Sequence, residues 1–188
     1  NLARFAETLL PLINKNKEKA IELATETINN FDSIFNKNWL EMMKKKLGLF
    51  GNKSEDEKLI SVLLSLMHNH KADYTNTFCS LMNERNEEEK IFTSEEFVNW
   101  HQQWKKRIKE NNHPYDESLK LMQSVNPTII PRNHKVEEVL EAANNDDLNS
   151  MKNLLKILEK PYENQEGINE YQLPAPPTDE KYQTFCGT

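Results

Sequence analysis

The sequence of 188 residues is poor in glycine, cysteine and long apolar runs. Its four glycines are Gly48, Gly51, Gly167 and Gly187, and the closest two stand three positions apart. Phosphate-binding loops need glycines at close spacing, because the backbone must approach the anion. Neither the P-loop pattern nor G-x-G-x-x-G can be written, so we expect no glycine-rich nucleotide loop in this chain.

The scarcity of cysteine and of apolar runs limits the cellular setting. Cys79 and Cys186 cannot build a disulfide scaffold, which favours a reducing, cytosolic environment. The longest apolar stretch covers 59–67, far short of the roughly 20 residues that a membrane-spanning helix needs. The sequence starts at Asn1 inside an apolar helical pattern, without a recognisable signal peptide. We therefore expect a piece of a longer chain that has no membrane partner.

Positive charge is in deficit, with 24 Lys and Arg against 30 Asp and Glu and a formal net charge of −6. Nucleic-acid binding depends on basic surfaces that neutralise phosphates, so we expect no nucleic-acid partner. Two short basic runs exist, at 44–46 and 105–107. Both fall within helical patterns beside apolar residues, and we interpret them as solvent-facing helix surfaces.

What is present is helical periodicity over nearly the whole chain up to residue 160. A first helix begins at residue 2 and should bend or end at Pro11, which lacks the N–H that a helix interior needs. A second pattern covers 17–47, with Gly48 as its C-terminal stop. Capping-box patterns at 54–57 and 93–96 predict two more helix starts. Further helices are predicted over 72–82, 117–125, 136–144 and 148–159.

An aromatic stripe marks the expected core, with Phe97, Trp100, Trp104 and Ile108 at steps of 3, 4 and 4. The acidic balance favours a buried role for this stripe over a base-stacking platform. Beyond Pro161, prolines at 174, 176 and 177 exclude a helix, and no alternating strand pattern persists anywhere. The sequence predicts an all-α fold, an irregular multi-helix bundle with an extended, proline-rich C-terminal tail.

Candidate chemistry is sparse. His68 and His70 stand two positions apart, and such a pair on a helix points in directions about 200° apart. Solvated helix-end residues explain them better than a metal site, and neither Glu-x-x-His nor His-Glu-x-x-His occurs. Cys79 is expected to be an inert, buried thiol. We therefore predict no catalytic residue, no cofactor-binding residue and no metal ligand in this chain.

Cys186 has a different setting, close to the C-terminus and beyond the proline-rich stretch. A thiol in such a position is accessible enough for redox chemistry. Its local surroundings alone favour a tail residue that has no role.

Several segments, in order along the chain, resemble the selenoprotein O family. Each is weak alone, but together they cover nearly the whole chain, and the resemblance implies the C-terminal region of such a protein. The segments are 1–6 (NLARFA), 46–48 (KLG), 73–78 (DYTNTF), 121–127 (LMQSVNP), 131–133 (PRN), 138–143, 154–155, 160–162 (KPY), the prolines at 174, 176 and 177, and Cys186.

The resemblance implies an activity for the parent protein. Members of the family are protein adenylyltransferases with a protein-kinase-like fold, which bind ATP and a divalent metal such as Mg²⁺ and transfer AMP to hydroxyl groups of proteins. Their ATP and metal ligands lie upstream of the position matched by Asn1. The resemblance thus implies ATP and Mg²⁺ for the full-length parent, no cofactor in this fragment, protein substrates, and a cytoplasmic bacterial enzyme.

It also implies a division of the chain. Residues 1–50 would complete the helical lobe of the upstream kinase-like core, 51–160 would form a helical extension, and 161–188 would form a wrapping tail. Cys186 matches a near-terminal position that carries selenocysteine or cysteine in relatives and is linked there to redox control. Cys186 is therefore the redox candidate.

Four residues are expected to be structural anchors. Asn126 and Pro127 break a helix, and Arg132 and Asn133 follow a second proline break. Asn133 is expected to cap the next helix, and Arg132 to fork onto a carboxylate or helix-end carbonyls. Two functions follow as hypotheses: a non-catalytic region that buttresses the core and presents Cys186, or an independent helical protein-interaction module without nucleotide chemistry.

Overall fold

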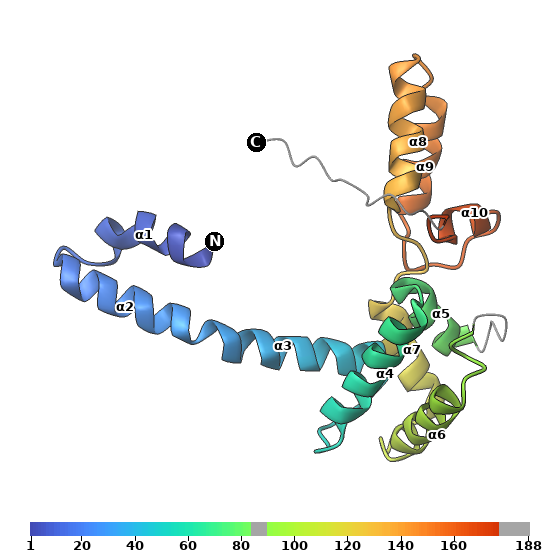
Figure 1. Ribbon diagram of the computed structural model, residues 1–188, viewed down its shortest axis with the longest axis horizontal. Helices are drawn as coiled ribbons and strands as arrows, with labels where there is room; N and C mark the ends of the chain where they lie inside the picture. Colours follow the sequence, from blue (N-terminus) through green and yellow to red (C-terminus); the bar gives the residue numbers. More distant parts are fainter. Residues whose placement is uncertain (84–89, 177–188) are drawn as a thin grey trace. The chain divides into compact units, whose positions relative to one another are not determined.

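A computed structural model describes residues 1–83 and 90–176, which form helices and no strand (Figure 1). The all-α class predicted from the sequence is confirmed. None of these described helices is long and apolar enough to cross a membrane. The helices are α1 (Leu2–Ile13), α2 (Lys17–Asn29), α3 (Phe31–Lys46), α4 (Asp56–His70), α5 (Tyr74–Asn83), α6 (Glu95–Lys109), α7 (Tyr115–Val125), α8 (Asn133–Asn144), α9 (Asn149–Leu158) and α10 (Asn169–Gln172).

The chain divides into two compact units, one formed by Asn1–Lys44 and one that begins at Lys45. The first contains α1, α2 and most of α3, and the second contains α4 to α10. The boundaries at residues 50 and 160, which follow from the family resemblance, stay predictions.

In the first unit, the single helix predicted over 17–47 is wrong, because the chain ends α2 and starts α3 around Asn30. Asn16 caps α2 by accepting a hydrogen bond from the amide of Lys19. Helix α1 continues two residues past Pro11 and ends at Ile13, although Pro11 has no N–H to donate to the carbonyl of Glu7. Helix α1 has no buried residue, and α2 buries only Ala20 and Ala24.

The second unit is organised around α4 and α6, and the aromatic stripe of α6 is buried as predicted. The rings of Trp100 and Trp104 stack with centroids 5.9 Å apart. The indole of Trp100 donates to the carbonyl of Leu59 (2.8 Å), and that of Trp104 donates to the carbonyl of Leu47 (2.9 Å). Both buried indole N–H groups therefore have partners, which lets these large side chains fill the core without leaving an unmatched donor.

The two predicted capping boxes do not form. The first residue of α4 is Asp56, and no side chain caps this helix at its N-terminus. The cap of α6 is Ser94, which accepts from the amide of Phe97 (3.2 Å). The sequence pattern thus located both helix starts, but the residues at the N-cap positions are Glu55 for α4 and Ser94 for α6, one position after the Ser54 and Thr93 that begin the two patterns.

The segment after Pro161 packs back onto the helical part of the second unit. The amide of Thr128 donates to the carbonyl of Pro161 (2.7 Å), and the side chain of Gln172 donates to the carbonyl of Thr128 (2.8 Å). The short helix α10 interrupts the stretch that was expected to be extended throughout. Residues 177–188, and with them Cys186, lie outside the described residues.

Candidate functional site

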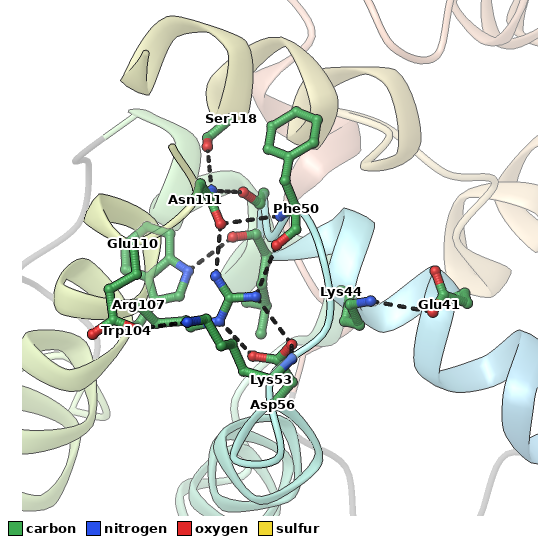
Figure 2. A network of polar contacts seen from close by, with 12 residues as sticks. Glu41, Lys44, Phe50, Lys53, Asp56, Trp104, Arg107, Glu110, Asn111 and Ser118 are labelled. Atoms are coloured by element: carbon green, nitrogen blue, oxygen red, sulfur yellow. Dashed lines mark hydrogen bonds and ion pairs between the residues drawn. The ribbon is translucent and has the colours of Figure 1, made fainter. Parts of the chain in front are cut away.

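The most deeply buried charges of the second unit meet at Arg107 of α6, which is 7% exposed (Figure 2). Its Nε donates to Oδ1 of Asp56 (2.6 Å) and its Nη2 donates to Oδ2 of the same carboxylate (3.1 Å). The guanidinium also donates to Oδ1 of Asn111 (2.7 Å) and to the carbonyl of Phe50 (2.9 Å). Such a two-pronged, charge-assisted pair fixes both distance and orientation.

Asn111 extends this cluster to α7. Its Oδ1 also accepts from the amide of Phe50 (3.1 Å), and its Nδ2 donates to the carbonyl of Gly48 (2.8 Å) and to Oγ of Ser118 (2.9 Å). The cluster therefore ties the loop that follows α3 to α4, α6 and α7. Its charges and amides face one another, which suits a structural cross-link better than a ligand site.

Two basic residues depart from the expectation of solvent-facing basic runs, while Lys45, Lys105 and Lys106 are exposed as predicted. Arg107 is buried against Asp56, and Lys44 is buried and pairs with Glu41 (3.1 Å). The reason is that a partner from another part of the chain, or one turn earlier in the helix, offsets the cost of desolvating the charge. The partner of Arg107 lies 51 residues away and does not show in the local pattern.

Gly48 takes up a backbone conformation that few residues adopt, with φ of +67°. A Cβ placed on it would lie 2.9 Å from the carbonyl oxygen of Ser118 and 3.1 Å from the side chain of Met122. Gly51 has the same φ, but a Cβ there would meet nothing within 4 Å. Both positions favour glycine because of their positive φ, and at position 48 the close approach to α7 leaves no room for a side chain as well.

A second ion pair forms between buried Arg132 and partly exposed Asp73. The guanidinium donates to both carboxylate oxygens of Asp73 (2.7 and 3.0 Å) and to Oδ1 of Asn76 (3.0 Å), so Arg132 forks onto a carboxylate as predicted. Burial alone would raise the pKa of the Asp73 carboxyl, but hydrogen bonds from Arg132, Asn76 and Thr75 and the charge of Arg132 hold that pKa below its ordinary value. Among the described residues, the Nε of Arg132 has no partner.

Asn126 and Pro127 lie where α7 ends. Asn126 is 1% exposed, its Nδ2 donates to the carbonyl of Lys46 (2.9 Å), and its Oδ1 accepts from Nζ of Lys46 (3.2 Å). The carbonyl of Pro127 accepts from the thiol of Cys79 (3.3 Å). The loop after α7 is thereby held to the end of α3 and to α5.

The capping role expected for Asn133 is wrong. Arg132 occupies the N-cap position of α8, Asn133 is already the first helical residue, and no side chain makes the cap hydrogen bond. The helix starts three residues earlier than the apolar pattern predicted.

The thiol of Cys79 is poorly suited to nucleophilic chemistry. Burial and the nearby negative charge of Asp73 raise its pKa to about 11, and only the thiolate is nucleophilic. His68 is exposed and His70 half-buried. Within residues 1–83 and 90–176, no group of three or more His, Cys, Asp or Glu side chains could hold a metal ion.

Sequence reasoning missed the partners of both arginines. Asp56 was given no role of its own within the capping-box pattern at 54–57, and neither Asn111 nor Asp73 was singled out as a partner. Asp56 and Arg107 are 51 residues apart, and Asp73 and Arg132 are 59 apart. No periodic pattern links residues at such separations, so only the fold brings them together.

Comparison with known proteins gives consistent matches along the chain. The family model of "Protein adenylyltransferase SelO" matches residues 1–159. Similar relatives carry the name "Protein nucleotidyltransferase YdiU": one from Pelagibacter ubique is 49% identical over 188 residues, and one from Clostridium perfringens (strain 13) is 46% identical over 188 residues. Each alignment includes all of this chain but only 39% and 38% of the respective relative. The chain thus spans about two fifths of the length of these relatives.

Proposed function

The chain belongs to the SelO family of protein adenylyltransferases, and we propose that it is a non-catalytic, helical C-terminal region of such an enzyme. In this proposal, an upstream kinase-like core binds ATP and Mg²⁺ and transfers AMP to hydroxyl groups of protein substrates in the bacterial cytoplasm. The 188 residues buttress that core, and Cys186 serves as a redox residue near the C-terminus.

The main support is that full alignment of this chain leaves about three fifths of its relatives unmatched. The polar chemistry of the chain points the same way. Transfer of AMP needs cations and a metal positioned around the phosphates. The two buried arginines, Arg107 and Arg132, are instead held on the carboxylates of Asp56 and Asp73. Both guanidinium groups thus form ion pairs that link helices of the chain.

Association with the core tests the proposal. The 188-residue chain and the separately produced upstream core of the same protein are mixed and passed through a gel-filtration column. We expect them to elute together, because the chain supplies helices on which the core depends. Separate elution would favour an independent helical interaction module and would overturn the proposal.

The redox role of Cys186 is tested on the same mixture. Oxidation would join its thiol to a cysteine of the core, with two thiols giving two protons and two electrons to an added oxidant such as diamide. We expect a covalent complex on a denaturing gel without reductant, its loss on adding reductant, and its absence with Cys186→Ser. An unchanged complex with Cys79→Ser is the matched control, because the thiol of Cys79 has a raised pKa. A Cys186 thiol that stays free after oxidation would overturn the redox role.

A further inference from the structure

The first compact unit carries an apolar groove that nothing within that unit fills. The groove has a volume of about 420 Å³ and lies between α1, α2 and the start of α3. Every residue that lines it is apolar except Thr27, whose hydroxyl already donates to the carbonyl of Leu23 (2.9 Å). Several lining side chains are half or more exposed, including Leu2 (50%), Phe5 (62%) and Ile34 (57%).

This groove leaves the unit short of buried surface. Helix α1 buries no residue, and α2 buries only two alanines. A unit of this size buries too little apolar surface to be stable alone, and contiguous exposed apolar patches mark interaction sites in soluble proteins. The unit therefore needs a cover that removes the groove from water.

The chemistry of the groove indicates what covers it. Sites for small molecules combine apolar walls with a few polar groups that orient the ligand. The described side chains that line this groove carry no charge and offer no free hydrogen-bond donor. A nucleotide or another anion would lose its water without compensation there. Apolar side chains of a protein are the occupants that fit.

We propose that the groove docks apolar side chains of the upstream core, the part of the full-length protein that lies outside these 188 residues. The length of that part supports this occupant, because about three fifths of each relative is unmatched. The family model also includes every lining residue, so the groove belongs to the region shared by the family. The inference rests on the proposed function and adds the surface through which the buttressing acts.

Thiol labelling tests the docking. Phe5→Cys places a thiol in the groove, and Leu12→Cys is the matched control on the same helix, since Leu12 is 83% exposed and does not line the groove. Maleimide labelling rates are measured for each variant in the 188-residue chain and in the full-length protein, with peptide mapping to separate the native thiols. We expect the Phe5→Cys thiol to label about tenfold more slowly in the full-length protein, because only brief opening exposes it, and the Leu12→Cys thiol to label equally in both.

A second variant covers the case in which loss of the Phe5 ring itself weakens docking. Ala6→Cys also lies in the groove and adds only a sulfur atom, so its thiol should be protected in the full-length protein as well. Equal labelling of both groove thiols in the two proteins, while chain and core still elute together, would overturn this inference and leave the proposed function intact. If the groove thiols of the 188-residue chain label more slowly as the concentration of that chain rises, the occupant is a second copy of the chain. That result would also overturn this inference. Failure of chain and core to associate would overturn both this inference and the proposed function.

Discussion

Replacing Arg107 with methionine should lower the free energy of unfolding of the second unit by about 3–5 kcal/mol, because it leaves the carboxylate of Asp56 buried without its cation. Asp56 is 2% exposed, and among the described residues its carboxylate would keep the hydrogen bond from the amide of Lys53 (3.0 Å) but no cation. Methionine retains most of the aliphatic stem, so loss of packing contributes little. The loss is large beside the 5–15 kcal/mol by which folded domains are usually stable.

The measurement is urea unfolding followed by the fluorescence of Trp100 and Trp104, which lie in the core of the same unit. Arg4→Met is the control for removing an arginine from a carboxylate, because the Arg4–Glu7 pair has the same chemistry at 2.8 Å but lies at the surface. That control should change stability by no more than about 1 kcal/mol. A similarly small effect for Arg107→Met would contradict the account of the buried cluster.

The double variant Asp56→Leu with Arg107→Met separates the pair from its surroundings. Removing both charges leaves no isolated carboxylate. The double variant should therefore lose less free energy of unfolding than the two single variants lose in sum, by about 0.5–3 kcal/mol. Some cost should persist, because the carbonyl of Phe50 and the side chain of Asn111 lose a donor. Additive single costs would show that the two residues act independently.

Gly48→Ala should destabilise the same unit by about 2–4 kcal/mol, since two costs add at this position. A side chain at φ of +67° costs about 1–2 kcal/mol by itself. The new methyl group would also press on the carbonyl oxygen of Ser118 at 2.9 Å, which is backbone and cannot move aside without shifting α7.

Gly51→Ala is the control, because it has the same φ and open space around the added methyl group. It should cost only the conformational part, about 1–2 kcal/mol. Thermal or urea unfolding of the two variants gives the difference directly. Equal losses would show that the close approach of Gly48 to α7 carries no energetic weight.

The sequence predicted those parts of the fold that depend on local periodicity. The stripe from Phe97 to Ile108 repeats every three or four residues, and the helix that it predicts buries all four stripe residues in the second unit. The break at Asn30 was not predictable in this way, because neither proline nor glycine marks it. The buried positions of Lys44 and Arg107 were also missed, since a basic residue is expected at the surface unless its partner is known.

The candidate clusters show the same limit. The two-pronged contact of Arg132 with a carboxylate was predicted from its residue type, but its partner Asp73 lies 59 residues away and was not named. The capping role of Asn133 was wrong, because Arg132 occupies the N-cap position of α8 and no side chain makes the cap hydrogen bond. Residue chemistry thus predicted the kind of contact, and the fold alone determined the partner.

The most direct test of the central claim is AMP transfer by the 188-residue chain alone. The chain is incubated with radiolabelled ATP, Mg²⁺ and a bacterial extract as the source of protein substrates, beside the full-length protein under the same conditions. We expect labelled proteins with the full-length enzyme and no labelling above background with the chain alone. Robust AMP transfer by the isolated 188 residues would contradict the account.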